Sequence, residues 1–416
     1  MGSSTSSKRP PGSPRHAGQS ALILAFVVII FLPSVGLMVQ PHRRQAGGSW
    51  QASERRPFPR LTRQWSSILS FPKGFAQYFA ANFGFRRNLI RWHTTIAKKV
   101  FGKSSSGSVL EGRDGWLFYG DSKTVEDYRG MFPFAPEQLE RWGKVLQNRR
   151  DWLAAQGIRY LFVVCPDKHS VYPEYMPAVV NRVQPRTRLD QLLQYLKENS
   201  TVEVLDLRPA LLELKKSRLC YQPQETHWNG IGALTGYQEI VRRLRGWYPD
   251  LCALEMADCE VFAQENAHTD LLRLLGRQDI LTHFDDVRPI RGFAAERKVD
   301  PNEAAGTTYR VMRSTRRGAP IGRLLMFHDS FGIPLTDFLS EHVRAGLYIW
   351  SKADRFLAQD VLEYRPDVVI EEILERKLCE IRLQTLEESL PALPDIPSST
   401  AASHPSGSLP DPGSGI

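Results

Sequence analysis

The sequence predicts an α/β protein with an open parallel sheet, helices on both faces and an N-terminal transmembrane helix. Between residues 106 and 382, short apolar runs typical of buried parallel strands alternate with amphipathic helix patterns. Residues 21–39 carry no charge and nearly fill one bilayer crossing. We divide the chain into a basic tail (1–20), a transmembrane anchor (21–40), a juxtamembrane connecting region (41–105), a folded domain (106–382) and a disordered tail (383–416).

The apolar run near the N-terminus has two interpretations. A cleaved signal peptide is one, with Ser34 and Gly36 as small residues before a cleavage site. The run is longer than a typical signal core, which favours an uncleaved anchor. Basic residues flank both ends, so the positive-inside count alone does not place the folded domain outside. Long domains translocate largely regardless of flanking charge.

The net charge of +9 comes mostly from the N-terminal region. Residues 1–65 contain a single acid, Glu54, against these basic residues: Lys8, Arg9, Arg15, Arg43, Arg44, Arg55, Arg56, Arg60 and Arg63. A basic flank beside a membrane segment explains this excess. The rest of the chain is nearly neutral and has no nucleic-acid-binding motif, so no nucleic-acid partner is expected.

The folded domain is preceded by an expected helix at residues 75–99. A helix then begins at Pro136 and ends near Gly157, ahead of a buried strand at residues 160–164. Thr187 is predicted to cap a second helix. Further strands are expected at residues 202–207, 323–327, 346–350 and 367–370, and further helices around residues 231–245 and 353–364. Residues 250–320 are less regular and are predicted to form an insertion with short strands.

The five cysteines contain no CxxC pair, which argues against a zinc ribbon. A disulfide between Cys252 and Cys259 and a set of ordinary buried thiols both fit the spacing.

Two motifs carry candidate chemistry. Residues 221–230 (Tyr-Gln-Pro-Gln-Glu-Thr-His-Trp-Asn-Gly) place Glu225 and His227 at the start of a helix. Residues 325–332 (Leu-Met-Phe-His-Asp-Ser-Phe-Gly) run from a strand into a turn at Ser330, at the sheet edge where open α/β folds bind ligands. Serine needs a base to act as a nucleophile, and the base needs a carboxylate to orient it. We therefore predict a triad of Ser330, His227 and Glu225.

Each residue also has a structural interpretation. A serine after aspartate is most often a turn cap, and a histidine beside Trp228 is most often a packed core residue. The two motifs occur together at the ends of predicted elements in one sheet, and this favours catalysis. Asp329 is interpreted as a turn residue and not as a second acid.

These motifs resemble the alginate O-acetyltransferase family, the AlgJ/AlgX-like SGNH proteins. The resemblance runs from about residue 71 to residue 378. Other segments are similar in order: residues 71–75, 82–86, 112–119, 166–174, 188–191 and 365–372. It implies an SGNH-hydrolase-like fold, with Ser330 as the acetylated nucleophile and His227 as the base. Glu225 stands where the family usually has Asp, and Asn82 and His328 also depart from its pattern. We interpret His328 as packing against the sheet.

The resemblance further implies an O-acetyltransferase that modifies an exported polysaccharide. It implies a membrane-bound O-acyltransferase partner as acetyl donor and a single-pass protein of the bacterial inner membrane, with its catalytic domain in the periplasm. No metal or cofactor is expected, and alginate itself is not assumed as the acceptor.

Two alternatives remain: an acetyl-esterase with the same triad, and a non-catalytic polysaccharide-binding scaffold. Trp116, Tyr119, Tyr172 and Trp228 could stack against sugar rings, but core or loop packing is the favoured interpretation of each. Lys168 and His169 lie just after a predicted strand and could contact an acidic sugar.

Overall fold

The computed structural model describes Phe26 and residues 58–59, 65–82, 108–121, 123–266, 269–277, 279–299, 309–351 and 356–380. Apart from Phe26, the predicted basic tail and anchor lie outside the described residues, as do residues 83–99 of the predicted connecting helix and the predicted disordered tail. Within the described ranges, no helix combines the length and the apolar character needed to cross a membrane.

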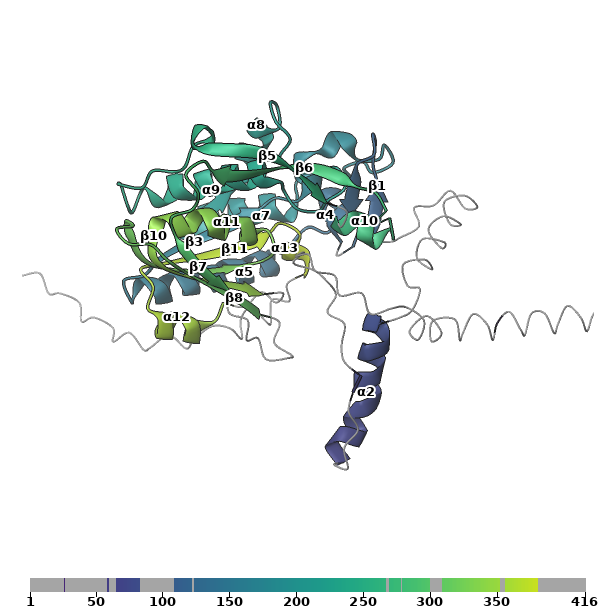
Figure 1. Cartoon of the computed structure of the whole chain (residues 1–416), viewed down its shortest axis with the longest axis horizontal. Helices are drawn as coiled ribbons and strands as arrows, with labels where there is room; N and C mark the ends of the chain where they lie inside the picture. Colours follow the sequence, from purple (N-terminus) through teal and green to yellow (C-terminus); the bar gives the residue numbers. More distant parts are fainter. Residues whose placement is uncertain are drawn as a thin grey trace, which may run out of the picture.

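A seven-stranded sheet forms the centre of the domain (Figure 1). Its strand order is β4 (Val204–Asp206), β3 (Arg159–Cys165), β11 (Val368–Leu374), β9 (Ile321–His328), β10 (Val343–Ser351), β8 (Tyr309–Thr315) and β7 (Glu296–Val299). The first five strands are parallel to one another. All five overlap strands that the sequence predicted.

The prediction of a wholly parallel sheet was wrong, because β8 and β7 are antiparallel to their neighbours. Only residues 316–320 connect β8 to β9, and β10 lies between these two strands. A parallel connection needs a crossover of about a dozen residues or more, so this short link requires β8 to run in the opposite direction. The sheet is therefore mixed.

Helices cover both faces of the sheet, as predicted. In β3, Tyr160, Phe162 and Val164 pack on one face, together with α5 (Pro136–Ala154), α7 (Arg188–Asn199) and α12 (Ala358–Tyr364). Leu161, Val163 and Cys165 pack on the other, with α8 (Arg208–Leu214), α9 (Gly230–Leu244) and α11 (Gly332–Leu339). Because successive strand residues point to opposite faces, one apolar run supplies both cores. Figure 1 shows α9 and α11 on the side of the sheet opposite α5 and α12.

The predicted starts of the helices at Pro136 and after Thr187 are confirmed, whereas the helix expected from residue 75 begins ten residues earlier, at Trp65. Pro136 begins α5, and Thr187 caps α7 by accepting a hydrogen bond from the Asp190 backbone N–H. Asn229 caps α9 through a 2.9 Å hydrogen bond from the Gly232 N–H. This last cap ties the end of the first motif to the helix that follows it.

The remaining helices and strands lie outside the seven-stranded sheet. They are α2 (Trp65–Asn82), the hairpin β1 (Val109–Glu111) and β2 (Leu117–Tyr119), α4 (Thr124–Tyr128), α6 (Lys168–Val171), the hairpin β5 (Cys259–Asn266) and β6 (Thr282–Pro289), α10 (Asp270–Leu274) and α13 (Lys377–Glu380). The predicted insertion at residues 250–320 thus contains a hairpin with α10 between its strands. It also supplies β7 and β8 to the main sheet. Cys252 and Cys259 are free thiols.

A buried ion pair joins α5 to β11. Arg149, whose side chain is wholly buried, donates from Nη1 to Glu371 Oε1 at 2.5 Å, and the Tyr160 hydroxyl donates to Glu371 Oε2 at 2.5 Å. Burying these charges is costly unless they remain paired.

We predict that Glu371→Leu lowers the free energy of unfolding by about 3–5 kcal/mol, because it leaves the buried Arg149 charge uncompensated. Urea denaturation followed by circular dichroism measures this loss. The double variant Arg149→Met/Glu371→Leu is the control and should recover most of the stability. Equal stability of the single variant and the unsubstituted protein would contradict the prediction.

Candidate active site

Ser330 lies in the turn between β9 and α11. Asp329 shapes this turn: its carboxylate accepts hydrogen bonds from the Phe331 N–H (2.8 Å) and from the Leu374 N–H at the end of β11 (2.8 Å). The Asp329 N–H donates to Glu372 Oε2 at 3.0 Å. Both carboxylate oxygens of Asp329 are thus used to hold the backbone, which agrees with its interpretation as a turn residue. The turn is bound to the neighbouring parallel strand.

Gly332 allows His328 to sit beside the turn. A Cβ atom at position 332 would lie 2.5 Å from the His328 Cβ and 2.8 Å from Glu372 Oε2, so a larger residue would have to displace both. His328 is buried, and its Nδ1 donates to the Asp329 carbonyl at 2.7 Å. It therefore packs against the turn.

The first motif forms a closed loop before α9. Tyr221 and Trp228 form an isolated antiparallel bridge across it, and the Tyr221 hydroxyl donates to the Pro166 carbonyl at 2.6 Å. The Trp228 ring lies 5.5 Å from that of Phe331, the residue after Ser330. These contacts bring the two motifs together although they are far apart in the chain.

The three predicted site residues form one hydrogen-bonded chain. His227 Nε2 lies 2.9 Å from Ser330 Oγ, and His227 Nδ1 lies 3.0 Å from Glu225 Oε1. When Nδ1 carries the proton and donates it to Glu225, Nε2 is free to accept the Ser330 hydroxyl proton. This is the geometry that an activated serine nucleophile requires.

The site favours a charged pair of Glu225 and His227. Burial alone would raise the pKa of Glu225, but the hydrogen bond and charge of His227 and the backbone N–H groups of Asp270 and Thr226 hold it well below its usual range. Burial alone would lower the pKa of His227, but Glu225 and then Asp270 raise it above its usual value. The charged imidazolium form of His227 is therefore stabilised.

Asp270 is a site residue that the sequence did not reveal. It begins α10, and its Oδ2 lies 3.4 Å from His227 Nδ1. It follows Thr226 by 44 residues, in a segment whose pattern predicted only an irregular insertion. No local spacing signal links it to the motif, because the contact arises from the packing of the β5–β6 hairpin. For example, a Cβ at Gly230 would lie 2.5 Å from Asp286 of β6.

Glu225, His227 and Asp270 also have the number and spacing of ligand atoms for a divalent cation, all within 4.8 Å of one another. Each of these atoms is nevertheless engaged by the others or by Thr226. Glu225 accepts from His227 Nδ1 and from the Thr226 N–H, and Asp270 accepts from the Thr226 hydroxyl. These hydrogen bonds account for the cluster without an ion.

Comparisons with known proteins agree with the sequence motifs. Residues 109–307 match the family described as SGNH hydrolase-like domain, acetyltransferase AlgX. The match contains Glu225, His227 and Asp270 and ends before Ser330. Residues 109–307 thus resemble the AlgJ/AlgX-like family.

A curated relative is the "Probable alginate O-acetylase AlgJ" of Pseudomonas aeruginosa, which is 25% identical over 174 residues, 41% of each chain. The present chain thus matches less than half of that relative's length. Among solved structures, Bacillus cereus PatB1 is similar with a TM-score of 0.47 and 15% identity, covering 65% of this chain and 96% of that chain. The O-acetyltransferase domain of Pseudomonas putida AlgJ has a TM-score of 0.42 and 16% identity, covering 68% and 99%.

In this AlgJ/AlgX-like chain, Lys168 holds the loop that carries Glu225 and His227. The side chain is buried, and Nζ donates to the carbonyls of Gln222 (3.0 Å), Pro223 (3.0 Å) and Glu225 (2.7 Å). The ammonium also lies over the Trp116 and Phe118 rings. Burial lowers the pKa of Lys168 to about 7, against the opposing effect of the Glu225 charge.

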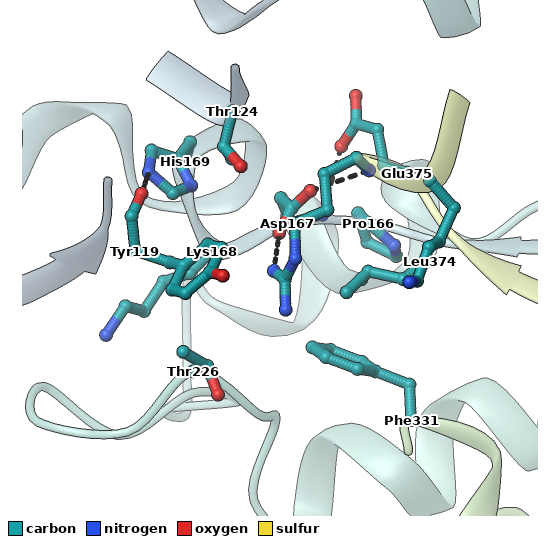
Figure 2. A network of polar contacts seen from close by, with 12 residues as sticks. Tyr119, Thr124, Pro166, Asp167, Lys168, His169, Thr226, Phe331, Leu374 and Glu375 are labelled. Atoms are coloured by element: carbon teal, nitrogen blue, oxygen red, sulfur yellow. Dashed lines mark hydrogen bonds and ion pairs between the residues drawn. The ribbon is translucent and has the colours of Figure 1, made fainter. Parts of the chain in front are cut away.

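A network of buried polar groups lies behind Lys168 (Figure 2). Asp167 forms an ion pair with Arg376, and its N–H donates to Glu375 Oε2 at 3.0 Å. His169 Nε2 contacts the Tyr119 carbonyl at 2.9 Å. Figure 2 shows Thr226 and Phe331, one from each motif, on one side of this network. The network joins the carboxyl ends of β3 and β11 beside the site.

Several candidate sugar contacts of the sequence analysis are therefore structural. Lys168 and His169 are each only 2% exposed, and Trp116, Tyr172 and Trp228 are also buried. Trp116 stacks on Tyr175 with the ring centroids 4.2 Å apart. The sequence placed Lys168 and His169 at the functional edge of the sheet, but it could not show that neighbouring side chains cover them.

We predict that Lys168→Met slows acylation of Ser330 by about 100-fold, because small displacements of catalytic groups have effects of this size. Mass spectrometry of the protein mixed with an activated acetyl ester measures the rate. Lys216→Met is the matched control, since Lys216 forms an exposed ion pair with Glu213 and its loss should change little. A Lys168→Met protein that is folded and fully active would contradict the role of this lysine.

Proposed function

We propose that the chain is an O-acetyltransferase that forms an acetyl ester on Ser330 and passes the acetyl group to a hydroxyl of an exported polysaccharide. One observation carries this proposal: the hydrogen-bonded chain from Ser330 through His227 to Glu225. The resemblance to the AlgJ/AlgX-like family supports the acetyl group and the polysaccharide acceptor.

The proposed reaction has two balanced steps. In the first, His227 Nε2 takes the Ser330 proton while Oγ attacks the carbonyl of the acetyl donor. The donor's leaving group then departs with the proton that His227 returns. In the second, His227 takes the proton of a sugar hydroxyl, which attacks the acetyl-serine and releases Ser330 with its proton restored. Among the described residues, none accepts a hydrogen bond from the Ser330 backbone N–H, which can therefore donate to the oxyanion.

The cellular setting is also part of this proposal. We infer that residues 21–40 anchor the chain in a bacterial inner membrane, with the catalytic domain in the periplasm. A membrane-bound O-acyltransferase would then supply the acetyl group at the membrane surface. The uncharged sequence of residues 21–39 supports the anchor, and the family resemblance supports the partner.

We expect that incubation with an activated acetyl ester adds one acetyl group to the peptide that contains Ser330. Mass spectrometry of the digested protein detects it. Ser330→Ala and His227→Ala should both abolish the adduct, since one removes the nucleophile and the other its base. The exposed Ser217→Ala is the matched control and should retain it. A folded protein without any adduct would favour the non-catalytic scaffold.

The same acyl-enzyme serves an esterase if water replaces the sugar as acceptor. Product analysis with and without an oligosaccharide acceptor separates the two activities. Transfer of acetyl to the sugar supports the transferase. Release of free acetate at an unchanged rate in both cases supports the esterase.

We also predict that Ser330 acylation falls as the pH decreases, with a midpoint above 6.5. The base must be neutral, and Glu225 and Asp270 raise the pKa of His227, so the base is lost as the pH falls through this raised value. Removing one of these charges lowers the pKa of His227. The midpoint of Glu225→Gln should therefore move to lower pH, together with a slower rate. A midpoint that does not change in this variant would contradict the assignment of Glu225.

A further inference from the structure

Asp270 contacts the catalytic histidine from outside the predicted motifs. Its Oδ2 lies 3.4 Å from His227 Nδ1 and accepts the Thr226 hydroxyl at 3.1 Å. Its Oδ1 accepts from Arg273 Nη2 at 3.0 Å, one turn later on α10. The Asp270 side chain is 16% exposed. A largely buried carboxylate is thus directed at the imidazole nitrogen that does not face Ser330.

The backbone of the same residue holds Glu225. The Asp270 N–H donates to Glu225 Oε2 at 2.9 Å, while Glu225 Oε1 contacts His227. Glutamate is one methylene longer than aspartate, so its carboxylate has one more rotatable bond to restrain. The hydrogen bond from the Asp270 N–H to Glu225 Oε2 restrains this rotation and keeps Oε1 in contact with His227 Nδ1.

We propose that Asp270 is a second carboxylate partner of His227, which stabilises the imidazolium formed during acyl transfer and positions Glu225. The acyl-transfer part of this statement rests on the proposed function. Asp270 is a positioning residue, because it acts through His227 and Glu225, which it contacts directly.

The charges around His227 make this role testable. Glu225 on its own loop and Asp270 on α10 are negative, and both raise the pKa of His227. Arg376, after β11, lowers it, and Arg273 is ion-paired with Asp270. Lys168 is held on the carbonyls of the same loop. Burial and the Glu225 charge raise the pKa of Asp270, so Asp270 takes up a proton before Glu225 as the pH falls.

The first test measures the pKa of His227 directly. The full-length protein, labelled with ¹³C at histidine and kept in detergent with EDTA, is titrated by NMR, and His227→Gln assigns the signal. Asp270→Asn should lower the pKa of His227 by about one unit. Arg273→Gln should raise it, because the charge that offsets Asp270 is removed. Asp279→Asn is the matched control on the same segment, where Asp279 pairs with Arg277, and should leave the value unchanged.

An unchanged His227 pKa in Asp270→Asn would overturn the proposal, because a purely structural aspartate has no reason to shift it. If Asp270→Asn does not fold, the Arg273→Gln variant provides the test. An Arg273→Gln protein in which the pKa of His227 does not rise would also overturn the proposal. This measurement needs no turnover. A shifted pKa without any acetyl-Ser330 would therefore contradict the proposed function and leave the inference about Asp270 standing.

The second test measures acylation. Asp270→Asn should slow Ser330 acylation by about tenfold and move its acidic midpoint to lower pH. Glu225→Gln should retain more activity than Glu225→Gln/Asp270→Asn, which should fall to the level of His227→Ala. Equal rates for the Glu225→Gln single variant and the double variant would show that Asp270 does not support His227 and would overturn the proposal.

Discussion

The active site depends on how the buried ammonium of Lys168 is satisfied. A lysine enclosed by protein must find hydrogen-bond acceptors, and here it takes three carbonyls from the one loop that carries Glu225 and His227. Lys168 itself follows β3 directly, so the loop is tied to the sheet edge. The Ser330 turn is tied to the same edge by Asp329, which binds the end of β11. Ser330 and the loop of His227 are thus tied to the ends of two adjacent parallel strands, β11 and β3.

Much of this arrangement could be predicted from sequence, for identifiable reasons. The five parallel strands are continuous apolar runs because both of their faces are buried, and such runs are easily recognised. Thr187 is a cap residue whose preference is local. Ser330, His227 and Glu225 stood out because each lies within a few residues of a predicted element end. All of these signals act over a few positions.

The features that escaped prediction depend on contacts between distant segments. β7 is exposed and strongly charged along its length, so no apolar run marks it. The direction of β8 follows from the shortness of the link to β9, which matters only once β10 is known to lie between them. Asp270 reaches His227 only because a hairpin packs against α9. Lys168 was suspected of contacting substrate because the sequence showed its position at the edge but not its burial.

The strand order also determines how late in folding the sheet can be completed. β11 lies between β3 and β9 and is the last strand of the described residues, about 200 residues after β3. Until it arrives, two long apolar strands lack their partner, and the Ser330 turn lacks the anchor at Leu374. Such late, non-local pairing makes folding slow and leaves sheet edges open to aggregation. The central part of the sheet can therefore be completed only after β11 has been synthesised.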